Sequence, residues 1–365
     1  MVKKYDRKII LEDGQEYLGY GFGADKSSVL EIVFNTSMVG YQEILSDPSY
    51  TYQAVVMTYP LIGNYGMAEE DFERDTPTIG ALIVHEYNDE PSNFRSIATL
   101  SEVMRKFGIP GIYGIDTRKL TRSIRDYGSR KVLITDITTT LDAGLKILKS
   151  TNIPTDAVSR VSCEKIMISY SKRHNKQHVV AIDCGMKMNI VRSLNSRNCK
   201  VTIVPWNTPS KDIFALRPDG IFISNGPGDP TDVPQTIETV KELIGMYPIF
   251  GICLGHQIIS LAYGAKTYKL KFGHRGGNHP VRNLMTNKIE ITSQNHSYAV
   301  DADSLAGTPL SITHINLLDN TIEGVKCDKD NVFSVQYHPE SAPGPQDSAY
   351  LFDRFINMME EQNNA

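Results

Sequence analysis

From His178 onward, apolar runs typical of strands alternate with helix-like segments, and this alternation constrains the fold more than any other feature of the chain. The runs HVVAID, VTIVP, DGIFIS and PIFGIC are separated by short connections and by segments with helical spacing of apolar residues. Parallel strands need crossover connections of this kind, whereas antiparallel strands do not. We therefore expect an α/β domain with a mostly parallel sheet over residues 178–365.

The first half of the chain has a different pattern of strand-like and helix-like segments. Residues 1–150 contain a turn signal at Asp13-Gly14, strand-like runs such as LEIVFNTS and IGALIVHEY, and a helix-like TLSEVMRKFG, without regular alternation. This pattern favours an α+β domain. Residues 151–177 are polar and end in the basic stretch SKRHNKQ, which predicts a linker between two domains.

Composition excludes several classes of protein. The 365 residues carry a net charge of -4, which does not favour nucleic-acid binding. No run approaches the ~18 apolar residues of a membrane helix, and the N-terminal MVKKYDRK is not followed by the apolar core of a signal peptide. The five cysteines are scattered, with no CxxC spacing, so we expect free thiols in a cytoplasmic protein.

The stretch FGICLGHQ places Cys253 where a strand ends and a helix begins. Ligands of open parallel sheets bind at the carboxyl ends of strands. Gly251 and Gly255 flank the cysteine as G-x-C-x-G, the thiol counterpart of the nucleophile elbow. The following helix would direct its positive end at the sulfur and so favour the thiolate, and the N–H of Leu254 would donate to an oxyanion. The pattern therefore predicts a nucleophilic cysteine.

A cysteine nucleophile needs a base and an orienting group. His338 follows the apolar run FSVQY, and Glu340 comes two residues later, placed to hold the imidazole tautomer. The loop SNGPGDP follows another strand, and its Gly226 would supply a second oxyanion donor. We expect these three pieces to meet Cys253 at one edge of the sheet.

Other interpretations compete with this one. Most single cysteines are small buried hydrophobes. A metal site would need Cys253 together with His256, His274 and His279. No spacing pattern of a metal site links these histidines to Cys253, so we expect no metal. We expect His256 to orient a neighbour or to line the pocket. The stretch GYGFGA near the N-terminus follows a hairpin and opens no helix, and no G-x-x-x-x-G-K-[ST] occurs, so no cofactor is expected in this chain.

In this order, SNGPGDP, GICLGHQ and QYHPE resemble the class I, or triad, glutamine amidotransferases, over roughly residues 178–360. The resemblance implies a flavodoxin-like sheet. FNTSMVGYQEILSDPSY, GIPGIYGIDTRKLTRSIR, KFGHRGGNHPV and SQNHSYAV are similar to the small subunit of carbamoyl phosphate synthase, and this likeness runs essentially end to end.

The resemblance implies a reaction and its residues. Cys253 attacks the side-chain amide of glutamine, His338 carries protons, and Glu340 supports it. The resemblance also implies which residues of this chain contact glutamine, with Leu254 and Gly226 forming the oxyanion hole. These contacts are Ser49, Gly226, Gly228, Leu254, Gln257, Asn295, Ser297 and Tyr298. Ser49 comes from the other half of the chain, so the pocket is expected at a domain interface. Ammonia passes to a large subunit, which uses bicarbonate, ATP and Mg²⁺ in a heterodimer or a higher assembly of heterodimers.

Two features leave questions open. The family pattern has glycine where this chain has Ser297, and serine would cost about 1 kcal/mol if that backbone had a positive φ. The run RKLTRSIRDYGSRK, residues 118–131, is basic, and it fits either a solvated helix face or a surface for the partner. The resemblance is compatible with arginine synthesis, pyrimidine synthesis or both as the pathway served.

Three alternative functions remain beside the main one. They are a glutaminase of another amidotransferase pathway, a non-catalytic regulatory subunit and a thiol peptidase on the same scaffold. The N-terminal half argues against another pathway, because those glutaminase modules lack it. The presence of Cys253, His338 and Glu340 together argues against a non-catalytic subunit.

Overall fold

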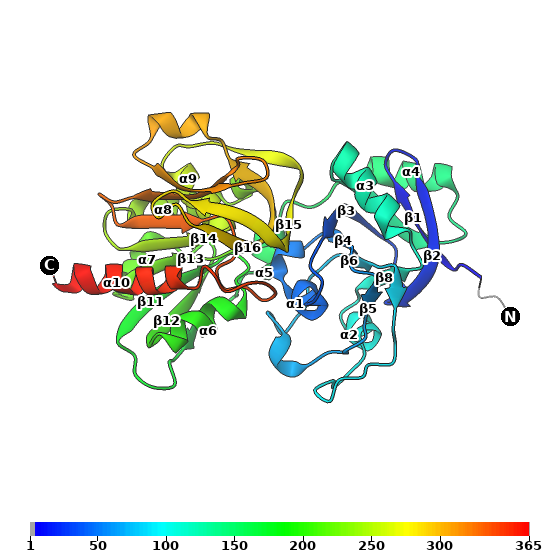
Figure 1. Ribbon diagram of the computed structural model, residues 1–365, viewed down its shortest axis with the longest axis horizontal. Helices are drawn as coiled ribbons and strands as arrows, with labels where there is room; N and C mark the ends of the chain where they lie inside the picture. Colours follow the sequence, from blue (N-terminus) through cyan, green and yellow to red (C-terminus); the bar gives the residue numbers. More distant parts are fainter. Residues whose placement is uncertain (1–3, 365) are drawn as a thin grey trace. The chain divides into compact units, whose positions relative to one another are not determined.

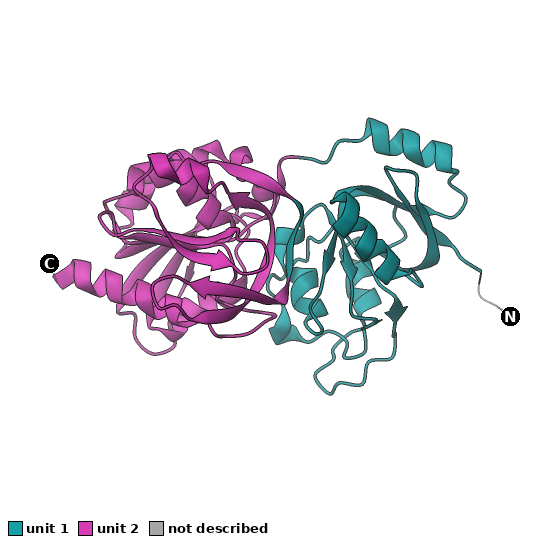
Figure 2. Cartoon of the chain, turned by 45° about the horizontal axis from the view of Figure 1, so that its top comes forward, with its two compact units in different colours: residues 1–154, 271–275 teal, residues 155–270, 276–365 magenta. Residues whose placement is uncertain are grey.

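The computed structural model describes residues 4–364 and divides into two compact units (Figures 1 and 2). Unit 1 consists of residues 1–154 and 271–275, and unit 2 consists of residues 155–270 and 276–365. The segment expected as a linker lies mostly in unit 2, which begins at Thr155, and it contains the helix α5 (Ala157–Val161) and the strand β10 (Met167–Ser169). The strand β10 was not predicted from the sequence, because it has only three residues and lies in a polar segment.

Unit 1 is built on a closed barrel with the strand order β1-β2-β8-β6-β4-β3-β9. Its strands are β1 (Arg7–Leu11), β2 (Glu16–Gly23), β3 (Ser28–Asn35), β4 (Gln53–Met57), β6 (Ala81–Ile83), β8 (Pro110–Tyr113) and β9 (Arg130–Asp136), and a separate small sheet pairs β5 (Leu61–Ile62) with β7 (Glu86–Tyr87). The predicted hairpin is confirmed: β1 and β2 are antiparallel, and Gly14 has the positive φ of 86° that this tight turn requires.

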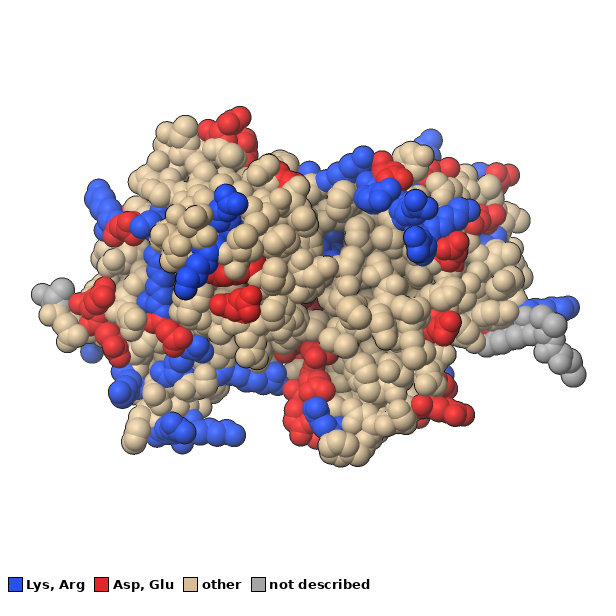
Figure 3. Space-filling view, viewed as in Figure 1, with Lys and Arg blue, Asp and Glu red and all other residues tan. Residues whose placement is uncertain are grey.

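The helices of unit 1 pack against this barrel. They are α1 (Tyr41–Ser46), α2 (Leu100–Lys106), α3 (Thr117–Tyr127) and α4 (Leu141–Ser150), with the short 3-10 helices η1 (Pro48–Tyr50) and η2 (Glu69–Asp71). In α3, Leu120 and Ile124 are fully buried in the barrel core, while the arginines of this helix stay exposed. Figure 3 shows Lys and Arg side chains gathered over the part of unit 1 where Figure 1 draws α3.

Unit 2 contains a ten-stranded sheet with the order β10-β12-β11-β13-β14-β19-β18-β17-β15-β16. Its further strands are β11 (Gln177–Asp183), β12 (Cys199–Pro205), β13 (Gly220–Ile223), β14 (Ile249–Ile252), β15 (Thr267–Asn283), β16 (Ile289–Val300), β17 (Ser311–Asn316), β18 (Ile322–Cys327) and β19 (Val332–Val335). The run β12-β11-β13-β14-β19 is parallel throughout. Taken in chain order, these five strands have the 2-1-3-4-5 arrangement of flavodoxin-like folds, so the expected sheet is confirmed.

Helices cover both faces of the parallel part of the sheet. They are α6 (Met188–Ser196), α7 (Ser210–Ala215), α8 (Pro234–Leu243), α9 (Leu254–Ala262) and α10 (Tyr350–Asn364), with η3 (Pro230–Asp232) and η4 (Asp303–Gly307). Successive residues of β11 point to opposite faces: Val179 packs in a core with residues of α6 and α10, whereas Val180 packs in a core with residues of α8 and α9. This double burial explains the near-continuous apolar runs seen in the sequence.

Two sequence expectations about the whole chain can be compared with this structure. All five cysteines are free thiols. Over residues 4–364, no helix is long and apolar enough to cross a membrane.

Candidate active site

Cys253 occupies a strained turn between β14 and α9. Its backbone has φ 55° and ψ -105°, a conformation that non-glycine residues rarely adopt. A Cβ at Gly255 would lie 2.2 Å from the carbonyl oxygen of Ile223, and one at Gly251 would lie 2.8 Å from the backbone of Gly255. Only glycine fits these two positions, so the G-x-C-x-G pattern lets strand and helix approach closely around the cysteine.

The surroundings of Cys253 hold its side chain in one place. The residue is only 2% exposed. Its backbone N–H donates to the carbonyl of Val335, 2.9 Å away, and its Sγ lies 3.5 Å from the carbonyl oxygen of Asn295. Val335 ends β19, which is the strand that leads to His338, so the sheet itself brings the two predicted residues together.

His338 and Glu340 form a buried pair. His338 Nδ1 lies 2.6 Å from Glu340 Oε1, as the spacing of QYHPE predicts, and both residues are nearly inaccessible to solvent. Nδ1 therefore carries the proton in this bond, which leaves Nε2 as the atom available to a reacting group. Nε2 is buried, and it has no hydrogen-bond acceptor or donor of nitrogen or oxygen among residues 4–364.

A buried lysine completes this arrangement. Lys187 Nζ lies 3.0 Å from Glu340 Oε1 and also donates to the carbonyl of Ser341, and the lysine is 2% exposed. Asn189 donates to the carbonyl of Glu340. Sequence reasoning missed Lys187 and Asn189, although a lysine placed among apolar residues just after β11 is a signal that could have pointed to Lys187.

The charges of this cluster shift its pKa values. Burial opposes the charge on His338, but the Glu340 carboxylate and the Cys253 thiol outweigh it and raise the pKa of His338. Burial likewise opposes the charge on Glu340, but Lys187 and His338 together lower its pKa. The structure thus stabilises a protonated imidazole against an ionised carboxylate.

The loop SNGPGDP approaches the first turn of α9. A Cβ at Gly226 would lie 2.1 Å from the carbonyl oxygen of Cys184 and 2.8 Å from the Leu254 side chain. Position 226 therefore requires glycine, and the Gly226 backbone lies beside Leu254. The backbone N–H groups of these two residues are the predicted oxyanion donors. Gly228 has a positive φ of 88°, and a Cβ there would meet Ala157 at an ordinary contact distance of 3.6 Å.

The remaining predicted contacts of unit 2 lie on α9 and β16. Gln257 Nε2 donates to the carbonyl of Tyr298 at 2.9 Å and to Gln336 Oε1 at 3.0 Å, which ties α9 to the strand carrying Asn295. Ser297 lies within β16 and is not among the described residues with positive φ, so the strain considered for serine does not arise. Gln336 is a third residue that sequence reasoning missed.

Two further predicted residues have hydrogen-bond partners of their own. Ser49 belongs to unit 1, where it lies in η1, is buried and donates its backbone N–H to Asp47; its role stays a prediction. His256 Nδ1 lies 2.9 Å from Ser334 Oγ, and burial lowers its pKa to about 3. A neutral, fully buried His256 thus joins α9 to β19, which fits a residue that orients its neighbours.

Comparisons with known proteins cover both units. The chain matches the family model "Glutamine amidotransferase class-I" over residues 180–358 and the family model "Carbamoyl-phosphate synthase small chain, CPSase domain" over residues 9–134. The "Carbamoyl phosphate synthase small chain" of Fusobacterium nucleatum is 54% identical over 96% of this chain and 98% of that one. Proteins with the same name from Staphylococcus haemolyticus and Listeria innocua are 52% and 48% identical, each over 97% of this chain and 96% of theirs. The chain therefore belongs to the carbamoyl phosphate synthase small chain family.

Proposed function

We propose that this chain is the glutamine-hydrolysing subunit of a carbamoyl phosphate synthase. The observation that carries the proposal is the elbow of Cys253, which is strained at φ 55° and lies at the start of α9. The neighbouring strand, β19, leads to the buried His338–Glu340 pair. A strained cysteine at a helix N-terminus with a histidine nearby is the arrangement of an activated thiol nucleophile.

The proposed reaction uses these residues in two steps. Cys253 Sγ bonds to the carboxamide carbon of glutamine, and the C–N bond breaks as His338 gives a proton to the departing ammonia. Water then adds to the thioester with His338 as base, and the C–S bond breaks to give glutamate and the free thiol. Backbone N–H groups at Leu254 and Gly226 would stabilise the oxyanion in both steps.

The other glutamine contacts belong to the same proposal. Gln257, Asn295, Ser297 and Tyr298 would line the substrate pocket, together with Gly228 and, from unit 1, Ser49. Glu340 and Lys187 act through His338 by holding its orientation and charge. The ammonia would be used by a large partner subunit that supplies ATP and Mg²⁺ chemistry. The exposed basic face of α3 would be one surface for that partner.

The test replaces the nucleophile in the complex with the large subunit. Cys253→Ser is expected to abolish carbamoyl phosphate synthesis from glutamine, because the hydroxyl is a far weaker nucleophile, while synthesis from added ammonia continues. Cys163→Ser, at a half-buried thiol elsewhere in unit 2, is the matched control and should retain both activities. Glutamine-dependent synthesis that survived Cys253→Ser would refute the assignment.

A further inference from the structure

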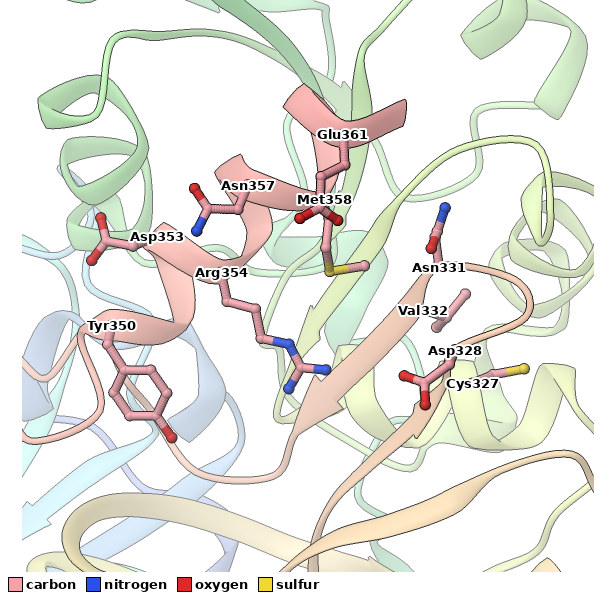
Figure 4. A pocket seen from close by; sticks show the side chains of 10 residues that line it. All are labelled: Cys327, Asp328, Asn331, Val332, Tyr350, Asp353, Arg354, Asn357, Met358 and Glu361. Atoms are coloured by element: carbon pink, nitrogen blue, oxygen red, sulfur yellow. The ribbon is translucent and has the colours of Figure 1, made fainter. Parts of the chain in front are cut away.

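A hollow of about 530 Å³ lies in unit 2 between the helix α10 and the turn that joins β18 to β19 (Figure 4). Its size falls within the range of roughly 300–1,000 Å³ that is typical of small-molecule sites. One wall comes from α10, and the facing wall runs from Cys327 to Val332. None of its lining residues belongs to the predicted active site.

Arg354 is the central feature of this hollow. In Figure 4 its side chain extends from α10 toward the wall that carries Asp328. Its guanidinium lies 4.5 Å from the centre of the Phe333 ring, but it forms no hydrogen bond or ion pair with any residue between 4 and 364. Burial lowers the pKa of Arg354, and the Asp328 carboxylate acts in the opposite direction. An arginine stays charged in such a setting, so a partly buried fork of N–H donors is left for an external acceptor.

Carboxylates also line this hollow. Asp328 stands on the facing wall and is paired with Lys326, and Asp353 is paired with Arg197. Glu361 lies on the same wall as Arg354 and has no ion pair among the described residues. The lining thus carries three acids against one base, with Val332 and Met358 as apolar surface between them. A simple anion would meet one favourable group and several unfavourable ones.

We propose that this hollow binds an α-amino acid with a cationic side chain, its carboxylate on Arg354 and its ammonium groups on Asp328 and Glu361. Arginine binds carboxylates in a bidentate manner, which gives such a contact both strength and direction. The apolar stem of the ligand would lie along Met358 and Val332.

The hollow is distinct from the active centre. Asp328 and Asn331 precede β19, whereas His338 follows it, so the four residues of this strand separate the two sites at opposite edges of the sheet. Binding here is therefore independent of the glutamine chemistry, and Cys253→Ser should leave it unchanged.

The test measures binding of three related probes to the purified full-length chain by calorimetry. L-lysine carries all three charges, cadaverine lacks the carboxylate, and 6-aminohexanoate lacks the α-ammonium. We expect L-lysine to bind at least about tenfold more tightly than either analogue, since each loses a charge-assisted contact. Equal binding of cadaverine, or no binding of L-lysine, would overturn the proposal.

Variants tie the signal to this hollow. Arg354→Gln and Glu361→Gln should each weaken L-lysine binding about tenfold or more, while the exposed Lys211→Gln on α7 removes a charge elsewhere in unit 2 and should not. Glu361 is exposed, so its variant tests the site even if Arg354→Gln disturbs the packing on Phe333. Binding that persists in the Glu361 variant at full strength would contradict the site.

Discussion

At the scale of single residues, the site depends on a line of buried charges. His338, Glu340 and Lys187 are each at most 4% exposed and are joined through Glu340 Oε1. A buried carboxylate is tolerable only because two cations neutralise it, and removing one member leaves an uncompensated charge. The cluster thus fixes the imidazole by electrostatics as well as by packing.

Glu340→Gln should therefore destabilise the chain in a pH-dependent way. The pKa of Glu340 is lowered on folding, so its contribution is present above the unfolded value of about 4.5 and is lost as pH falls. The pKa of His338 is raised, so its contribution is present below about 6.5 and is lost as pH rises through the folded value. The loss in the free energy of unfolding should be greatest between about pH 4.5 and 6.5, at about 3 kcal/mol.

Denaturant unfolding at pH 5.5 and at pH 9 checks this expectation. The exposed pair of Glu238 and Lys241 on α8 offers the control: Glu238→Gln should cost no more than about 0.5 kcal/mol at either pH. A Glu340→Gln effect that is equal at both pH values would show that packing, and not charge, accounts for the loss.

At the scale of elements, the turn between β14 and α9 depends on contacts that allow no side chain. The helix can begin immediately after Cys253 only because Gly251 and Gly255 bring it against the sheet. The adjoining Gly226 does the same for the loop after β13. The chemistry of the site is thus a consequence of how closely these three segments approach.

Gly255→Ala should destabilise unit 2 by roughly 3 kcal/mol, because the new methyl group would lie 2.2 Å from the carbonyl oxygen of Ile223 and backbone cannot easily give way. Gly307→Ala, at a glycine with nothing within 4 Å and no positive φ, is the matched control and should change stability by less than about 0.5 kcal/mol. Thermal unfolding of both variants makes the comparison. A tolerated Gly255→Ala would mean that strand and helix can separate without loss.

At the scale of the whole molecule, the two units are not consecutive pieces of sequence. β15 begins in unit 2, but its residues 271–275 belong to unit 1. There Lys271 accepts from the N–H of Ser129, and Phe272 packs against Phe34 with ring centres 5.8 Å apart. Residues 271–275 of β15 thus form part of the surface of the unit 1 barrel.

Phe272→Ala should loosen unit 1 specifically. The ring packs against the barrel core but is only partly buried, so a loss of about 2 kcal/mol is expected, less than for a fully buried phenylalanine. Hydrogen exchange should quicken in β3 of unit 1 and stay unchanged in β13 of unit 2. Tyr268→Ala, at an exposed ring in the unit 2 part of β15, is the control and should affect neither strand. Equal acceleration in β3 and β13 would show that the units unfold together.

The candidate site was more predictable than the fold around it. Cys253, His338 and Glu340 follow strands directly, and parallel strands bring their carboxyl ends to one edge, so local patterns were enough to group them. Lys187 was not found, because its partner lies more than 150 residues away in the sequence. The closed barrel of unit 1 was not foreseen either, because closure depends on β9 pairing with both β1 and β3, and no local pattern encodes such pairings.

The sequence by itself determined the alternation of strands and helices, the glycines of the elbow and the family to which the chain belongs. These features depend on local backbone preference and on side-chain period, which short segments already possess. Only the tertiary structure decided the charge state of the site, the barrel, the contribution of β15 to unit 1 and the hollow around Arg354. Each of these arises from contacts between distant segments, where burial and the sum of neighbouring charges set the outcome.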